Sequence, residues 1–200
     1  MTDFSTVSRH YAARTHEAMR PVLKNPQADG PAVHYYMIRG GQDQRNVTVW
    51  EPGKVGDEYI KTFGHYHIGQ LDETYWFKLG EGVLLMQKLE EADGTLVPNR
   101  VAEFKAIRVT AGQEQFIPAG YGHLVVNVGS TYFVTVDDSP VDFEERDPVS
   151  LPGHADYKLV EQMHGFAYYV VERSGKPALV RNPHYEAVAQ LDTGGLEIVD

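Results

Sequence analysis

Residues 62–75 read Thr-Phe-Gly-His-Tyr-His-Ile-Gly-Gln-Leu-Asp-Glu-Thr-Tyr. They begin in a run of aromatic and β-branched residues that is typical of a strand. Because side chains alternate across a strand, His65 and His67 are expected side by side on one face. Glu73 follows a short bend and starts the next predicted strand. Two imidazoles and a carboxylate in this order are plausible neighbouring ligands of one divalent metal ion.

A further histidine completes the pattern later in the chain. His123 follows the turn-forming residues 118–122 and starts a predicted strand at 124–128. A closed barrel would bring this position opposite the His-x-His pair. Taken singly, each of these residues is more often an ordinary surface or core residue, but the combination predicts a metal site. Three imidazoles and one carboxylate suit Fe, Mn, Ni, Co, Zn or Cu, and the ligand types do not choose among them.

The rest of the chain is predicted to be mostly β. Short apolar runs separated by turn residues are typical of a sandwich or barrel. The expected strands are residues 33–38, 46–51, 58–67, 74–79, 83–89, 102–109, 113–117, 124–128, 132–136, 166–172 and 176–181. Gly80-Glu81-Gly82 predicts a hairpin between the strands expected at 74–79 and 83–89. Ser174 and Gly175 predict a second hairpin between the last two strands.

The flanking and connecting segments have a different character. We expect a helix over residues 5–22 that ends at Pro21, and a short helix over 154–164. Residues 137–153 are polar and predict a loop, whereas 190–200 are predicted to be frayed. The chain is thus interpreted as a single domain: its divisions are an N-terminal arm (1–32), a barrel core (33–183) and a tail (184–200).

Composition narrows the possible functions. The 200 residues include no cysteine, so disulfides and thiolate metal sites are excluded, and a reducing cytoplasmic location is expected. No apolar run is long enough to predict a membrane span. A formal charge of −10 disfavours nucleic acid as a partner. The same charge means that an anionic substrate would need a local positive potential, from a metal ion or from oriented N–H groups.

The two histidine motifs resemble those of the cupin family. The first is Gly64-His65-Tyr66-His67 with Glu73 and Gly80, and the second is Pro118, Gly122-His123 and Asn127. Glu73 lies further behind His67 than the glutamate does in most cupins. In this spacing, residues 47–183 resemble one branch, the cupin-type glucose-6-phosphate isomerases of archaea and some bacteria.

The resemblance implies an all-β jelly-roll barrel with a short N-terminal helical arm and a few peripheral helices. It also implies a homodimer with one divalent metal ion per subunit, its identity unknown among Fe, Mn, Zn, Ni and Co. The implied metal ligands are His65, His67, Glu73 and His123. The implied substrate-binding residues are Thr48, Thr62, Gly64, Tyr75, His154 and Tyr157.

The activity implied is the interconversion of glucose 6-phosphate and fructose 6-phosphate. Glu73 is the candidate catalytic base, unless hydrogen moves by a hydride shift, in which case Glu73 is only a ligand. One difference from the family concerns Ser139, which stands where family members carry a tyrosine, and the loop at 141–151 is longer than expected. The alternatives are another metallocupin, such as a dioxygenase or a related sugar-phosphate isomerase or epimerase, and a sugar-binding cupin without catalysis.

Overall fold

The computed structural model describes residues 11–141 and 154–200. Its helical segments are α1 (His16–Met19), α2 (Lys158–Gln162) and the 3-10 turns η1 (Arg20–Val22) and η2 (Gln42–Gln44). Its strands are β1 (Tyr11–Thr15), β2 (Val33–Ile38), β3 (Asn46–Trp50), β4 (Lys54–Val55), β5 (Glu58–Tyr59), β6 (Tyr66–His67), β7 (Glu73–Leu79), β8 (Glu81–Ala92), β9 (Thr95–Thr110), β10 (Glu114–Ile117), β11 (Gly122–Asn127), β12 (Phe133–Asp137), β13 (Ala155–Asp156), β14 (Tyr168–Arg173), β15 (Lys176–Arg181), β16 (Ala187–Asp192) and β17 (Glu197–Val199).

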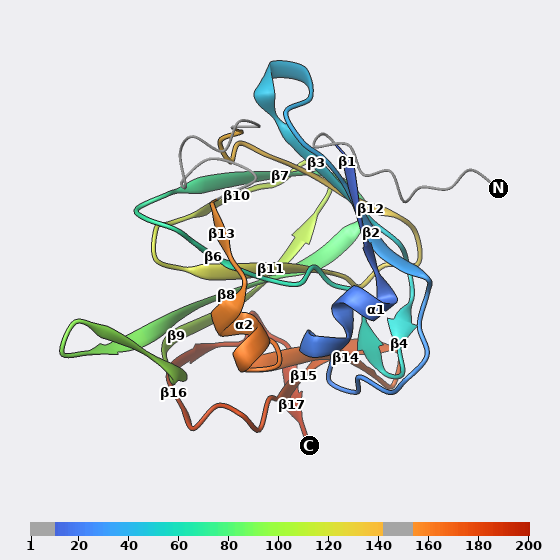
Figure 1. Ribbon diagram of the computed structural model, residues 1–200. Coiled ribbons are helices and arrows are strands. Elements are labelled where there is room, and N and C mark those ends of the chain that lie inside the picture. Colours follow the sequence, from blue (N-terminus) through green and yellow to red (C-terminus); the bar gives the residue numbers. More distant parts are fainter. Residues whose placement is uncertain (1–10, 142–153) are drawn as a thin grey trace.

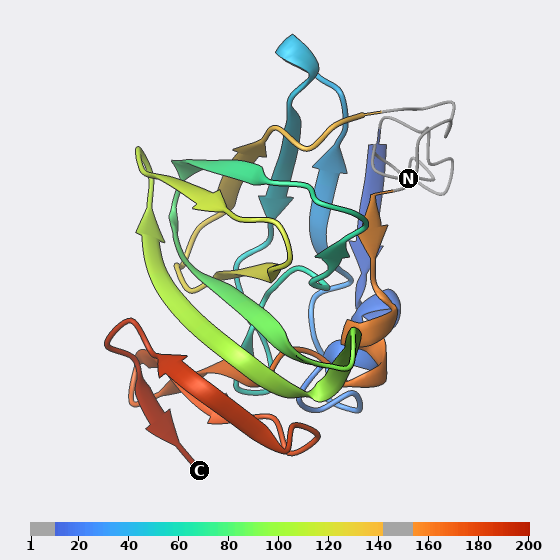
Figure 2. The same ribbon diagram turned by 90° about the vertical axis from the view of Figure 1, so that its left-hand side faces the viewer.

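The strands form sheets that wrap around a common interior (Figure 1). One sheet has the order β1-β2-β3-β12-β7-β10, and a second has the order β11-β8-β9-β16. The long strands β8 and β9 curve across the barrel, with the C-terminal strands along their outer side (Figure 2). The remaining pairs lie in a sheet of order β17-β15-β14-β5-β4 and in the short ladder β13-β6. This is the all-β cupin jelly-roll barrel that the sequence predicts.

Large apolar side chains from both main sheets fill the interior. The Phe133 ring lies 5.4 Å from that of Trp50 and 5.8 Å from that of Phe77, measured between centroids. From the facing sheet, Leu84 and Phe104 are also fully buried. The core therefore joins the two sheets.

The predicted hairpin at 80–82 is wrong. β7 and β8 belong to different sheets, so the chain crosses from one layer to the other at this point. A Cβ on Gly82 would lie 2.6 Å from the carbonyl oxygen of Val126 and 2.8 Å from the Phe133 ring. Glycine is thus needed here for close packing between layers, and not for a two-stranded turn.

The strand predicted over 58–67 is interrupted. Only its two ends form β5 and β6, and Gly64 between them has a φ of +81°. An added Cβ on Gly64 would lie 3.1 to 3.3 Å from atoms of Phe166 and Leu124. Backbone bridges nevertheless tie Lys61 to Val126 and His65 to His123, so this irregular segment runs beside β11.

The helix predicted over 5–22 is much shorter than expected. Residues 5–10 lie outside the described part, and residues 11–15 form β1, paired with β2. Edge pairing outweighs the weak helical periodicity of this stretch. The Thr15 side chain caps α1 by accepting a hydrogen bond from the Ala18 N–H, at 3.3 Å. Pro21 stands in η1, where the helical segment ends as predicted.

The C-terminal segment is ordered, which corrects the prediction of fraying over 190–200. β16 pairs in parallel with β9, and β17 pairs in parallel with β15. The predicted helix at 154–164 is reduced to α2, because residues 155–156 pair with β6. The hairpin around Ser174 and Gly175 is confirmed by the β14–β15 ladder. Of the described helices, none has the length and apolar character that a membrane crossing requires.

Candidate functional site

Three imidazoles and one carboxylate converge inside the barrel. One ligand-type atom from each of His65, His67, Glu73 and His123 lies within 4.8 Å of all the others. Oε2 of Glu73 is 3.0 Å from Nε2 of His123 and 3.2 Å from Nε2 of His67. The structure thus brings together all four residues that the sequence singled out.

Backbone pairing sets this arrangement. The His65 N–H donates to the carbonyl of His123 at 3.3 Å, and the His123 N–H donates back to the carbonyl of His65 at 3.0 Å. His67 follows in β6, and Glu73 is the first residue of β7. The imidazoles of His65 and His123 are therefore held with their ring centroids 4.5 Å apart.

The atoms that face one another are buried and have no hydrogen-bond partner among the described residues. They are Nε2 of His65, His67 and His123 and Oε2 of Glu73. His67 is also oriented from behind, because its Nδ1 lies 3.0 Å from the carbonyl oxygen of Leu71. A carbonyl only accepts, so Nδ1 carries the proton and Nε2 presents its lone pair to the cluster. Such unsatisfied donor atoms fit a metal ion, since buried polar groups otherwise find partners.

The electrostatics favour a cation at this point. Burial, reinforced by His123 and His67, holds the pKa of His65 well below its usual value, so this imidazole is neutral. Burial alone would raise the pKa of Glu73, but His123 and His67 hold it well below the usual range. Burial likewise opposes the charged form of His67, and the Glu73 carboxylate overcomes this and raises its pKa. The cluster therefore contains a buried carboxylate whose negative charge attracts a cation, either a proton on His67 or a metal ion.

A second group of polar residues holds Glu73 from the other side. The Ser139 hydroxyl donates to Oε1 of Glu73, and the Ser139 N–H donates to Oδ1 of Asp137 at 3.1 Å. Oδ1 of Asp137 also accepts from the Asn46 amide at 2.7 Å. Burial, followed by the charge of Glu73, raises the pKa of Asp137 well above its usual value. Ser139, which stands where the resemblance implies a tyrosine, is thus part of the site.

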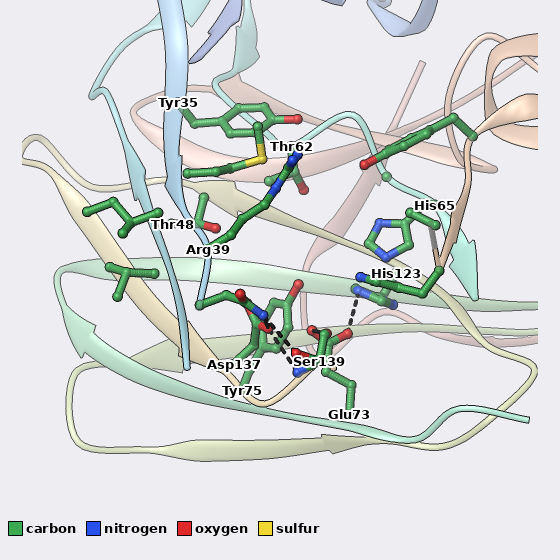
Figure 3. Close-up of a pocket in the computed structure, with 18 residues that line it drawn as sticks. Tyr35, Arg39, Thr48, Thr62, His65, Glu73, Tyr75, His123, Asp137 and Ser139 are labelled. Atoms are coloured by element: carbon green, nitrogen blue, oxygen red, sulfur yellow. Dashed lines mark hydrogen bonds and ion pairs between the residues drawn. The ribbon is translucent and has the colours of Figure 1, made fainter. Parts of the chain in front are cut away.

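A pocket opens beside the cluster, and the six residues implied for substrate binding all line it (Figure 3). These are Thr48, Thr62, Gly64, Tyr75, His154 and Tyr157. The pocket also contains Tyr35, Arg39, Asn46 and Asp137, which sequence reasoning missed. They come from β2, β3, β12 and the adjoining loops, where no local motif marks them. Asn46 is the first residue of β3 and Asp137 the last of β12, and a polar residue at the end of a strand is a weak sequence signal.

Two hydroxyl groups at the pocket already accept hydrogen bonds from protein N–H groups. The Thr62 hydroxyl accepts from the Val125 N–H at 3.0 Å. The Tyr35 hydroxyl accepts from the Phe63 N–H at 3.3 Å and from Nε of Arg14 at 3.2 Å. Because their lone pairs are engaged in this way, the O–H hydrogens remain available to donate to a ligand.

His154 and Tyr157 cover the cluster from the segment after the loop. The His154 ring centroid is 5.1 Å from that of His67, and that of Tyr157 is 5.6 Å from that of His65. Burial, with the charges of neighbouring groups, lowers the pKa of His154 to about 3, so this ring is neutral at pH 7. Both of its ring nitrogens lack partners among the described residues. The loop at 141–151 lies outside the described residues, apart from Val141.

A family model described as glucose-6-phosphate isomerase (GPI) matches residues 34–187. The glucose-6-phosphate isomerase of Thermococcus litoralis is 31% identical over 141 residues, which are 70% of this chain and 62% of that protein. That of Pyrococcus furiosus is 31% identical over 142 residues, 70% of this chain and 63% of that one. A putative glucose-6-phosphate isomerase 2 of Rhizobium meliloti is 36% identical over 104 residues, 52% of this chain and 46% of that protein.

Solved structures give more distant matches. The capsular polysaccharide assembling protein CapF of Staphylococcus aureus aligns over 60% of this chain and 30% of its own, with a TM-score of 0.39 and 20% identity. The oxalate decarboxylase of Bacillus subtilis aligns over 52% of this chain and 24% of its own, with a TM-score of 0.35 and 17% identity.

The family model covers more than half of the chain, and its range includes all four cluster residues. The aligned part spans 62 to 64% of the length of the first archaeal relatives. By this match, the chain belongs to the glucose-6-phosphate isomerase family.

Proposed function

We propose that this chain is a metal-dependent aldose–ketose isomerase that interconverts glucose 6-phosphate and fructose 6-phosphate. The observation that carries the proposal is the convergence of three imidazoles and a carboxylate beside a pocket, in a chain of this family. The four buried atoms without hydrogen-bond partners support one divalent ion per chain, held by His65, His67, Glu73 and His123.

The reaction moves one hydrogen between C1 and C2 of the open-chain sugar. A divalent ion at the cluster would act as a Lewis acid on the substrate oxygens. We assign Glu73 as the base that carries the proton between the two carbons. Its low pKa keeps it deprotonated, and the hydroxyl of Ser139 fixes the orientation of its carboxylate. The neighbouring imidazole of His154 is neutral at pH 7, so it adds no positive charge beside the cluster.

The residues around the pocket suit the two ends of a sugar phosphate. Thr48, Thr62 and the backbone at Gly64 are assigned to the phosphate, because hydroxyl and N–H groups donate well to an anion. Tyr75, His154 and Tyr157 are assigned to the sugar, since they surround the cluster on the side of the pocket.

The direct test is turnover by metal-loaded protein. Fructose 6-phosphate is supplied as substrate, and glucose 6-phosphate is detected with its NADP-dependent dehydrogenase, while oxygen consumption is recorded without sugar. We expect isomerisation that disappears on chelation, with no oxygen uptake. Oxygen uptake without isomerisation would favour a dioxygenase, and tight binding of the sugar phosphate without turnover would favour a binding protein.

A further inference from the structure

An acidic protein that binds a phosphate ester has an electrostatic problem. The chain carries a formal charge of −10, and the carboxylate of Glu73 lines the pocket. A divalent ion at the cluster would be balanced in part by Glu73. Neutral hydroxyl groups donate hydrogen bonds but bring no net charge. A dianionic phosphate in this pocket would therefore gain from a fixed cationic side chain near the threonines.

Arg39 has this position. It follows directly after β2, is partly buried and lines the pocket. Figure 3 shows its side chain extending past Thr48 toward Thr62, on the side of the pocket that lies away from His65 and His123. Its charge also acts within the pocket: besides burial, Arg39 is among the groups that shift the pKa of His154 and of Tyr157.

An arginine at the edge of a pocket often has a structural role, in which a neighbouring carboxylate pairs with its guanidinium. Among residues 11–141 and 154–200, no carboxylate forms an ion pair with Arg39 within 4.0 Å. Two other arginines differ in this respect. Arg45 pairs with Asp138 at 3.2 Å, and Arg14 donates to the Tyr35 hydroxyl at 3.2 Å. Among the described residues, these two arginines thus have a defined polar partner, whereas the guanidinium of Arg39 has neither an ion pair nor a side-chain hydrogen bond.

We propose that Arg39 is the charge-bearing residue that recognises the phosphate of the substrate. Its guanidinium acts together with the hydroxyl groups of Thr62 and Tyr35, whose hydrogens are free to donate. This inference rests on the proposed function, which identifies the bound phosphate as that of a sugar phosphate. The planar fork of an arginine matches two phosphate oxygens, which a threonine hydroxyl does not.

The test compares Arg39→Gln and Arg39→Lys with wild-type protein, all loaded with the same metal. The control is Arg100→Gln, which removes a partly exposed arginine that pairs with Glu90 on the β8–β9 hairpin. Three quantities are measured: KM and kcat for fructose 6-phosphate, kcat/KM for unphosphorylated fructose, and the Kd of inorganic phosphate by calorimetry.

For Arg39→Gln, we expect KM for fructose 6-phosphate and Kd for inorganic phosphate to rise about ten- to a hundredfold, the usual effect of losing a hydrogen bond to a charged group. The value of kcat, the use of fructose and all values for Arg100→Gln should change by less than about twofold. For Arg39→Lys, KM and phosphate Kd should lie between those of wild-type protein and Arg39→Gln, because lysine keeps the charge and loses the planar fork of the guanidinium.

Unchanged KM and phosphate Kd in Arg39→Gln would overturn the inference. An equal fall in kcat/KM for fructose and for fructose 6-phosphate would also overturn it. Failure of wild-type protein to bind inorganic phosphate would also overturn it. If wild-type protein binds inorganic phosphate but does not isomerise fructose 6-phosphate, the proposed function fails, and the phosphate titration alone decides the role of Arg39.

Discussion

At the scale of single residues, Glu73 has two different oxygen environments. Oε2 faces the imidazoles of His67 and His123, and Oε1 accepts the hydrogen bond from Ser139. A carboxylate held in this way suits both a metal ligand and a base that moves a proton between two carbons. The two roles differ in what happens when the charge is removed.

Glu73→Gln separates these roles, since it keeps the size and an oxygen donor but loses the charge and the basicity. We expect weaker metal binding, which excess metal overcomes because three histidines remain. At saturating metal, kcat should still fall by about a hundred- to ten-thousandfold, the contribution of a positioned base. The measurement is kcat against metal concentration. In addition, the incorporation of deuterium from D2O at C2 of the sugar product is measured with wild-type protein. Full rescue by metal, with no exchange at C2, would show that Glu73 is a ligand only and that hydrogen moves as hydride.

Ser139→Ala tests the residue that orients Glu73. Without the hydroxyl, Oε1 loses its buried donor, and the carboxylate is held less firmly toward the imidazoles. Groups that orient ligands typically contribute about ten- to a hundredfold to metal affinity. We therefore expect metal Kd to rise by that factor, measured by competition with a chelating dye. Ser130→Ala, at an exposed turn, is the matched control. A Kd equal to that of the control would mean that Ser139 does not position the ligand.

At the scale of elements, a buried ion pair fastens the segment after α1 to the barrel. Nζ of Lys61 lies 2.6 Å from Oε1 of Glu58, and both side chains are at most 3% exposed. Nζ also donates to the carbonyl of Val22 at 2.6 Å, and the other Glu58 oxygen accepts from the Lys24 N–H at 2.8 Å. The same stretch of chain, 58–67, then leads to His65 and His67. The support of the histidine–glutamate cluster and the docking of this segment are therefore physically connected.

Lys61→Met should destabilise the fold strongly, because it leaves the carboxylate of Glu58 buried without its partner. The expected loss in the free energy of unfolding is about 3–5 kcal/mol, measured with urea at pH 7. In the double variant Glu58→Gln with Lys61→Met, the loss should be smaller than in Lys61→Met alone, since no unpaired charge remains. Lys88→Met, at an exposed position of β8, is the control and should change little. A Lys61→Met variant as stable as the control would contradict the role of this pair.

At the scale of the whole molecule, the first sheet has an apolar outward face at its β1–β2 edge. Tyr11 is 60% exposed, Tyr36 40% and Ile38 36%, and the β1–β2 register pairs Tyr11 with Ile38. Contiguous exposed aromatic and aliphatic side chains typically mark an interface. This face is compatible with the homodimer expected from the sequence.

We predict that light scattering of the wild-type protein at micromolar concentration gives the mass of two chains. Tyr11→Lys combined with Tyr36→Lys should shift it to one chain, because paired charges are unfavourable at a twofold interface. Leu96→Lys, an exposed position on the β8–β9 hairpin, should leave the mass unchanged. A monomeric wild-type protein would contradict the prediction.

The cluster of three histidines and Glu73 could be predicted from sequence because its geometry depends on local features. His65 and His67 are two positions apart, and Glu73 follows a short bend, so their proximity survives even though the predicted strand at 58–67 is interrupted at Gly64. The second motif also predicted that His123 lies opposite the His-x-His pair. The structure confirms this, because the backbone of His123 pairs with that of His65.

Other parts depended on packing that sequence patterns do not contain. The residues 80–82 look like a hairpin turn, and only the layering of the two sheets makes them a crossing. Asn46 and Asp137 meet across 91 positions of sequence, and Arg39 enters the pocket from the end of a strand that carries no motif. The parallel pairing of β16 with β9 and of β17 with β15 was missed, because these ladders join a polar tail to the edges of two distant sheets.

The central claim is that His65, His67, Glu73 and His123 hold one divalent ion on which isomerisation depends. The most direct measurement is the metal content per chain together with the rate for fructose 6-phosphate, as chelated protein is titrated with Fe, Mn, Zn, Ni or Co. The control is His184→Ala, which changes an exposed histidine outside the cluster. This variant and wild-type protein should reach one ion per chain, with the rate rising in proportion to metal content. His65→Ala, His67→Ala and His123→Ala should each lose metal and activity together. Full occupancy in all three variants, or a rate in chelated wild-type protein equal to that of the loaded protein, would contradict the account.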